Sequence, residues 1–309
     1  MINLEEAADL IRQGYLVAFP TETVYGLGAS IQHPEAIARI FQVKKRPADN
    51  PLIVHIHSIE QVEELAEEIP AVFYILAIHF WPGPLSCVLK RKPSVPSIVS
   101  AGLDSIAIRI PSHSLALELI RRVGSPLVAP SANLSGKPSS TCAAHVLEDF
   151  QGQIAGILDG GKSLLGIEST VVDLRKEGEV VLLRPGSIGI EDLERVLGAP
   201  VTLFSGKGSA PSPGMRYRHY SPECPVKLFK TDRELQEYLE RAPLKKRMLL
   251  SDPAQEKTPH FDSYLLSAEE LYALLRQADR EEYEEVLVFC NQTTPLALMN
   301  RLTRAADSV

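Results

Sequence analysis

Two polar motifs far apart in the chain contain the residue types that bind phosphate. Lys44 and Arg46 lie at the predicted end of a helix, and Ser131 and Asn133 lie in VAPSANLSG, directly after a predicted strand. Lysine and arginine offset phosphate charge, and a turn of small residues offers backbone N–H groups and hydroxyls to an anion. Each motif alone also fits ordinary structure, because cations favour the last helical turn and Ser and Asn are common in turns.

Residues 199–225 have the composition of a linker or of a lid over an active site. This stretch is rich in Gly, Pro and Ser, lacks hydrophobic periodicity and is long for a connection inside one domain. Within it, Tyr217, His219 and Tyr220 alternate with arginines, a pattern that a plain spacer does not need.

A mixed α/β domain over residues 1–200 must position the two phosphate motifs. Asn3 and Glu6 form a capping-box pattern, and Pro34 begins a helix that ends at Lys44. Further helices are predicted over 59–67, 71–80, 114–123 and 190–197. Strands are predicted over 15–19, 52–57, 85–89, 106–110, 127–129, 169–174 and 180–184, with PTETVYGLG as a loop. Several strands follow one another without a helix, which favours an α+β twisted sheet with antiparallel pairs.

A second, smaller domain is predicted over residues 226–309, after a linker or lid over 201–225. Its strands are predicted over 226–229, 247–250, 263–266 and 285–290, and its helices over 232–241, over 268–279 and from Pro295. This alternation of strands and helices indicates a small parallel-sheet domain of Rossmann-like type. Neither domain contains a P-loop or a Rossmann glycine motif, so any ATP site is not of P-loop or Rossmann type.

Composition indicates a cytoplasmic globular protein. The 309 residues carry a formal charge of -7, which argues against a broad basic surface for nucleic acid. The four cysteines are scattered and form no CxxC pair, so neither a zinc ribbon nor a disulfide scaffold is indicated. The N-terminus does not read as a signal peptide, and the longest apolar run, residues 71–81, is too short for a membrane span.

Six ordered segments resemble one family. Lys44-x-Arg46 with Ser131-x-Asn133 resembles the signature of the YrdC-like nucleotide-binding fold. The segments FPTETVYGLG, RPADNPLIVHI, GIESTVVDL and LLRPG are similar to the same family, and SPGMRYRHYSP resembles the linker of the long, two-domain form of the threonylcarbamoyl-AMP synthase family. The resemblance covers residues 1–225, and beyond them only the layout of a small Rossmann-like domain matches.

The resemblance implies a site for L-threonine. It assigns Thr23, His55, Arg109 and Ser169 to this site, with Ala129 contributing through its backbone. Arg109 suits a carboxylate because a guanidinium pairs with it in bidentate fashion, although a structural ion pair is the alternative. His55, on an apolar strand, would otherwise be a core histidine.

The resemblance also implies an ATP site next to the threonine site. Its nucleotide-binding residues are Arg46, Asn50, Ser105, Ser131, Asn133, Ser139 and Arg184, and Lys44 and Arg46 are the catalytic cations. A tyrosine of the linker is expected to close over the bound intermediate, and Mg2+ is expected to arrive with ATP.

The implied reaction needs no covalent nucleophile on the protein. Threonine and bicarbonate or CO2 give a carbamate, which attacks the α-phosphate of ATP, expels pyrophosphate and leaves a carbamoyl-adenylate. A lid is useful because water destroys both the carbamate and the mixed anhydride. The product would pass to a downstream threonylcarbamoyl transferase complex that modifies tRNA, so tRNA is an indirect partner and no membrane is involved.

Two other functions remain open at this point. Domains of this fold can present a basic surface, so a tRNA or double-stranded RNA binding module is the main alternative, and the acidic charge balance weighs against it. A related carbamoyl transferase of hydrogenase maturation carries zinc-finger cysteines that are absent here. The C-terminal domain could also serve as a regulatory interaction domain.

Overall fold

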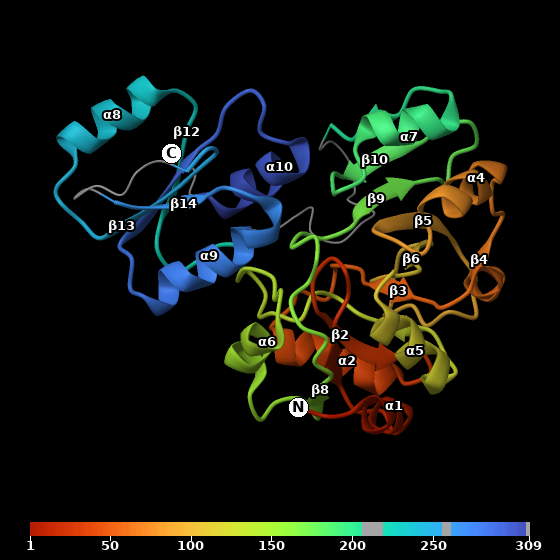
Figure 1. The fold of residues 1–309 in the computed structure, drawn as a ribbon. Helices are drawn as coiled ribbons and strands as arrows, with labels where there is room; N and C mark the ends of the chain where they lie inside the picture. The colour runs from red at the N-terminus through yellow and green to blue at the C-terminus, as the bar shows by residue number, and fades with distance from the viewer. Residues whose placement is uncertain (206–218, 255–260, 307–309) are drawn as a thin grey trace. The chain divides into compact units, whose positions relative to one another are not determined.

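The computed structural model describes residues 1–205, 219–254 and 261–306 of the chain (Figure 1). The chain divides into two compact units. The first contains residues 1–135 and 140–205, and the second contains residues 136–139 together with the described residues from 219 onward.

The first unit is built on an 11-stranded mixed sheet. Its strands are β1 Val17–Phe19, β2 Gly26–Ser30, β3 Ile53–His55, β4 Ala66–Glu67, β5 Leu85–Arg91, β6 Ser105–Arg109, β7 Leu127–Val128, β8 Gly156–Ile157, β9 Thr170–Asp173, β10 Val181–Arg184 and β11 Thr202–Leu203. Their order is β11-β10-β9-β5-β6-β3-β7-β2-β1-β8, with β4 paired to β5. The pairs β1–β2 and β5–β6 are antiparallel, whereas β3–β6 and β5–β9 are parallel. The predicted α+β sheet with antiparallel pairs is confirmed.

Helices cover both faces of this sheet. They are α1 Leu4–Arg12, α2 Pro34–Lys44, the 3-10 helix η1 Ile59–Gln61, α3 Val62–Leu65, α4 Ala71–Phe80, α5 Ser114–Val123, α6 Ala143–Phe150 and α7 Ile190–Leu197. Because side chains alternate along a strand, neighbouring residues enter different cores. Ala18 and Val128 pack with α2, α4 and α7, whereas Val17 and Leu127 pack with α1 and α5.

Helix α2 delivers the first phosphate motif. Pro34 lies in its first turn, and Ile37 and Ile40 are buried against the sheet. Lys44 is its last residue, as predicted, and Lys45 adopts a left-handed conformation with φ of 52°. The N–H of Arg46 then donates to the helix at Phe41, 2.8 Å away, which closes the helix end and turns the chain toward β3.

The segment PTETVYGLG is predicted as a loop, and this prediction is wrong for its last three residues, which begin strand β2. Glycines in a sequence usually indicate a turn, but the glycines of this segment leave space for a side chain of the neighbouring strand β1. Gly26 and Gly28 pair with Phe19 and Val17 of β1, and a Cβ at Gly28 would lie 2.8 Å from the Phe19 ring. Helix α6 was not predicted, and strands β4, β8 and β11 have two residues each, too few to show a periodic pattern.

The second unit is a small sheet with helices. Its strands are β12 Val226–Phe229, β13 Arg247–Ser251, β14 Asp262–Leu265 and β15 Glu285–Phe289, and its helices are α8 Asp232–Arg241, α9 Ala268–Arg280 and α10 Leu296–Ala305. The order β12-β15-β13-β14 is parallel throughout, which confirms the predicted parallel sheet. Thr231 caps α8 in a capping box with Glu234.

None of the helices in the described ranges is long and apolar enough to cross a bilayer.

Candidate functional site

Three predicted threonine ligands lie together at the carboxyl ends of two central strands of the first sheet. His55 ends β3 and Arg109 ends β6, and the two are register partners in this parallel pair. Thr23 comes from the loop after β1, and its Oγ1 accepts a hydrogen bond of 2.9 Å from Nη1 of Arg109. All three side chains are buried, so this cluster lies in the interior of the first unit.

Ser105, a predicted nucleotide ligand, lies on the same face of the sheet as the predicted threonine ligands His55 and Arg109. Ser105, Ala107 and Arg109 share a face of β6 because side chains alternate, and the register places Ile53 and His55 on the same face of β3. Four residues of strand span about 13 Å, so Ser105 lies about that far from Arg109. This spacing suits an amino acid and a nucleotide bound side by side.

Glu22 is a site residue that the sequence did not single out. Its Oε1 accepts a hydrogen bond from Nη2 of Arg109, and the two side chains are 7% and 4% exposed. Nε of Arg109 donates to the carbonyl of Gly83, 3.1 Å away. The available signal was that Glu22 is the one charged residue in PTETVYGLG, but in a loop this residue type is usually solvated.

The charges of this cluster follow from burial and from the ion pair. Burial pushes the pKa of Glu22 upward, but the charge and hydrogen bond of Arg109, helped by nearby N–H groups of Glu22 and Ser112, hold it below its ordinary value. Burial, reinforced by the charge of Arg109, lowers the pKa of His55 to about 3. At neutral pH the cluster therefore contains one cation, one anion and a neutral imidazole.

Ser169 is held in place beside this cluster by Ser86 and Arg184. Its hydroxyl lies 2.8 Å from Oγ of Ser86, and Arg184, at the end of β10, donates to its carbonyl at 3.1 Å and to its hydroxyl at 3.2 Å. Gly186 permits this packing, because a Cβ there would lie 2.3 Å from the backbone nitrogen of Thr170. A predicted threonine ligand and a predicted nucleotide ligand are thus in direct contact.

The two phosphate motifs meet in the first unit. Nζ of Lys44 donates to the carbonyl of Ser131 at 2.6 Å and to the carbonyl of Asn133. Within the turn, Oγ of Ser131 donates to Oδ1 of Asn133 at 2.6 Å, and the N–H of Ser135 donates to the carbonyl of Lys44 at 2.9 Å. Lys44 is fully buried, and its ammonium group holds two carbonyls of the turn in place.

Arg46 organises the loop that follows helix α2. Its Nε donates to the carbonyl of Asn50 at 3.2 Å, and Nη2 donates to that of Pro51 at 2.9 Å. Nδ2 of Asn50 is buried and has no hydrogen-bond partner among the described residues. A buried amide in this state has a donor available, and the predicted nucleotide contact would use it. Ala129 lies nearby along the sheet, with its N–H donating to the carbonyl of Ile53 at 3.0 Å.

Ser139 lies in the segment 136–139, which packs with the second unit. It is fully buried. Beside it, Nη2 of Arg276 from α9 donates to the carbonyl of Pro138 at 2.7 Å.

Two of the three predicted lid residues, His219 and Tyr220, are described, and both belong to the second unit. Tyr220 is 6% exposed, its ring stacks on that of Tyr272 at 5.3 Å, and the guanidinium of Arg301 lies 5.8 Å from the ring centre. Tyr217 lies outside the described residues. Which of the two tyrosines closes a lid stays a prediction, because only Tyr220 can be placed in the structure.

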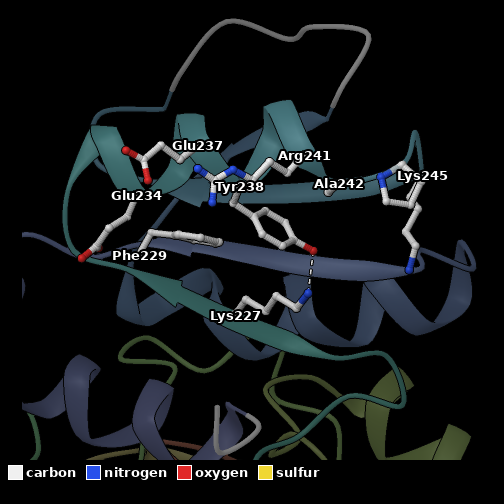
Figure 2. A pocket seen from close by; sticks show the side chains of 9 residues that line it. Lys227, Phe229, Glu234, Glu237, Tyr238, Arg241, Ala242 and Lys245 are labelled. Atoms are coloured by element: carbon white, nitrogen blue, oxygen red, sulfur yellow. Dashed lines mark hydrogen bonds between the residues drawn. The ribbon is translucent and has the colours of Figure 1, made fainter.

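The second unit contains a hollow of its own, with a volume of about 600 Å³ (Figure 2). It is lined by Lys227, Phe229, Glu234, Glu237, Tyr238, Arg241, Ala242, Pro243 and Lys245. None of the predicted site residues lines it. A polar network occupies one side, where Nζ of Lys227 donates to the hydroxyl of Tyr238 (Figure 2).

That network is centred on Glu285. Its Oε2 accepts from the hydroxyl of Tyr238 at 2.6 Å and lies 3.3 Å from Nζ of Lys227, and its Oε1 accepts from Nε of the fully buried Arg247. Burial pushes the pKa of Glu285 upward, but the hydrogen bonds from Tyr238, Arg247 and Lys227 outweigh it and hold the pKa below its ordinary value.

Glu285→Gln is expected to lower the free energy of unfolding of the second unit by about 1.5–3 kcal/mol at neutral pH, because charged hydrogen bonds become neutral ones. The loss should shrink in acid, since the contribution of a carboxyl with a lowered pKa disappears as the pH falls through that pKa. Urea denaturation followed by circular dichroism measures it. Glu240→Gln, at an exposed position of α8, is the control, and an equal loss there would show that the network is not responsible.

Comparison with known proteins identifies relatives over nearly the whole chain. The family model described as "Telomere recombination" matches residues 9–186, and the one described as "Threonylcarbamoyl-AMP synthase, C-terminal domain" matches residues 188–307. The chain is 44% identical over 316 residues to the threonylcarbamoyl-AMP synthase of Pyrococcus abyssi, covering 97% of this chain and 93% of that protein. It is 42% identical over 326 residues to the threonylcarbamoyl-AMP synthase of Bacillus subtilis, and the match covers 98% of this chain and 93% of that protein. The crystal structure of P. abyssi Sua5 complexed with L-threonine matches with a TM-score of 0.90 at 42% identity, covering 98% of this chain and 94% of that one.

Proposed function

This chain belongs to the threonylcarbamoyl-AMP synthase family, and we propose that it joins L-threonine, bicarbonate and ATP into L-threonylcarbamoyladenylate with release of pyrophosphate. The observation that carries the proposal is the buried cluster of Thr23, His55 and Arg109, because a guanidinium and neutral polar groups in an enclosed site suit a small amino acid. The P. abyssi relative was crystallised with L-threonine. The similarity favours a synthase over a nucleic-acid binding module.

The proposed chemistry is a nucleotidyl transfer. The amine of threonine and bicarbonate form a carbamate with loss of water, and a carbamate oxygen then attacks the α-phosphorus of ATP. The bond from that phosphorus to the pyrophosphate leaving group breaks as the new carbon–oxygen–phosphorus anhydride forms. The protein supplies alignment and positive charge rather than a covalent nucleophile.

We assign different tasks to the two cations of the first motif. Lys44 holds the carbonyls of Ser131 and Asn133, so its main effect is to orient the N–H groups and hydroxyls of that turn toward phosphate oxygens. Arg46 holds the loop that presents the amide of Asn50. The predicted nucleotide ligands are lysine, arginine, asparagine and serine, which suits Mg2+ that arrives with ATP rather than a resident metal.

The same proposal places the reaction in tRNA modification. The adenylate is an activated carbamate, so its consumer must be a transferase that moves the threonylcarbamoyl group to adenosine in tRNA. This chain then meets tRNA only indirectly, and the cytoplasm is the compartment in which we place it.

Pyrophosphate release is expected to require threonine and bicarbonate together, because the attacking group is the carbamate and neither precursor supplies it alone. Coupled-enzyme detection of pyrophosphate, with each substrate omitted in turn from a carbon-dioxide-free buffer, measures this. Serine should be a poorer substrate, although the missing methyl group is worth only about 1–3 kcal/mol. Equal release without threonine would contradict the proposed function.

A further inference from the structure

Among the residues that the structure describes, one carboxylate oxygen of Glu22 is buried without a hydrogen-bond partner. Oε1 is bonded to Arg109, whereas Oε2 is buried and has no hydrogen-bond partner among the described residues. An unpaired buried oxygen of a charged carboxylate is costly, and such groups in native structures call for an explanation. Nδ1 of His55, in the same cluster, is also buried and unpaired within the described chain.

Arg109 keeps free donors next to this oxygen. Three of its five N–H bonds are directed to Gly83, Thr23 and Glu22. Within the described residues this leaves one N–H on each terminal nitrogen, so the guanidinium can still donate two hydrogen bonds to a carboxylate. These donors and the negatively charged acceptor belong to one buried ion pair.

We propose that Oε2 of Glu22 receives the ammonium group of L-threonine while Arg109 receives its carboxylate. This assignment rests on the proposed function and adds a ligand to it. Glu22 then has two tasks, since Oε1 orients the guanidinium and Oε2 binds the substrate. The assignment concerns binding and not proton transfer.

Charge balance explains why an ammonium is needed. The cluster is neutral before binding, because Arg109 and Glu22 offset each other and His55 is uncharged. A substrate carboxylate on Arg109 would lie close to the carboxylate of Glu22, and like charges repel strongly in a buried site. An ammonium group on the substrate removes this repulsion. The cluster thus selects zwitterionic amino acids over hydroxy acids of the same shape.

Three ligands separate the two ends of the substrate. L-threonine carries ammonium, carboxylate and hydroxyl, L-2-aminobutyrate lacks the hydroxyl, and (R)-3-hydroxybutyrate lacks the ammonium. For the wild-type protein, calorimetric titration should show 3-hydroxybutyrate binding at least about tenfold more weakly than 2-aminobutyrate. Equal affinities would overturn the assignment, and this arm does not depend on any variant folding.

The variant Glu22→Gln provides the second arm. The substitution should weaken the binding of threonine and of 2-aminobutyrate by the same factor, about 10- to 100-fold. The affinity for 3-hydroxybutyrate should stay the same or increase. If Glu22 only oriented Arg109, all three ligands would weaken alike, because all three carry the carboxylate. A loss for threonine but not for 2-aminobutyrate would place the hydroxyl on Oε2 and also overturn the assignment.

A matched control and a separate readout keep the two proposals distinct. Glu64→Gln, an exposed carboxylate on α3, should leave all three affinities unchanged. If threonine binds neither the wild-type protein nor the variant, the proposed function itself is wrong. If threonine binds both equally well, only the role of Glu22 is wrong.

Discussion

Arg109→Ala is expected to lower the free energy of unfolding of the first unit by about 3–5 kcal/mol at neutral pH and to remove measurable threonine binding. Arg109 and Glu22 form an ion pair whose side chains are 4% and 7% exposed, so the substitution leaves a buried anion without its counter-charge. Trp81 is the single tryptophan of the chain and lies in the first unit, so its fluorescence during denaturation reports on that unit.

This loss of stability should be smaller in acid. In the wild-type protein Arg109 overcomes the effect of burial and lowers the pKa of Glu22, so the pair contributes stability above the unfolded pKa of the carboxyl, and this is lost as the pH falls through the lower folded pKa. Without Arg109, burial dominates and raises the pKa, so the variant is most stable when Glu22 is protonated. The difference between the two unfolding free energies should therefore shrink as the pH falls from the raised pKa of Glu22 in the variant to its lowered pKa in the wild-type protein.

A double substitution tests whether the buried charge is the cause. The double variant Glu22→Gln with Arg109→Met should keep most of the stability that Arg109→Met alone would lose, because a neutral pair of similar volume carries no buried charge. Threonine binding should stay absent, since both proposed partners of the zwitterion are gone. Equal destabilisation at pH 4 and pH 7, or failure of the double variant to recover, would contradict this account.

Elements with a strong local pattern could be predicted from the sequence. Helices α5 and α7 have the predicted bounds because each carries a periodic apolar pattern and is followed by a glycine. Helix α4 also has the predicted bounds, but it is apolar on all sides, and prolines at 70 and 82 flank it. Strand β12 and helix α8 have the predicted bounds as well. Strand β2 could not be predicted, because its glycines are required by the ring of Phe19 on a neighbouring strand. That contact depends on the register of the sheet and not on the local sequence.

The site shows the same division between local and distant information. A family pattern was enough to propose that Lys44 and Ser131 act together. It did not predict their contact, in which the lysine donates to backbone carbonyls of the turn. Glu22 was overlooked because its importance depends on Arg109, a residue 87 positions away. A carboxylate in a loop is usually solvated, but this one is buried in an ion pair. Burial depends on the fold and cannot be read from the local sequence.

Lys44→Met is expected to lower kcat/KM for ATP by about 100- to 1000-fold, the effect of losing preorganised donors in an active site. Nζ of Lys44 bonds to the carbonyls of Ser131 and Asn133. A methionine fills the same space but leaves these carbonyls unpaired, so the turn relaxes and its N–H groups and hydroxyls lose their alignment on the phosphates. Initial rates of pyrophosphate release, with ATP varied at saturating threonine and bicarbonate, measure the effect.

Lys45→Met is the matched control for this prediction. Lys45 is the next residue, carries the same charge and is exposed in a left-handed conformation that methionine would share. It should retain ATP kinetics within about twofold, because an exposed charge contributes little. Threonine affinity should be nearly unchanged in both variants, since the His55 and Arg109 cluster has its own partners. If Lys45→Met lost as much activity as Lys44→Met, general positive charge would explain the effect and the proposed anchoring of the turn would be wrong.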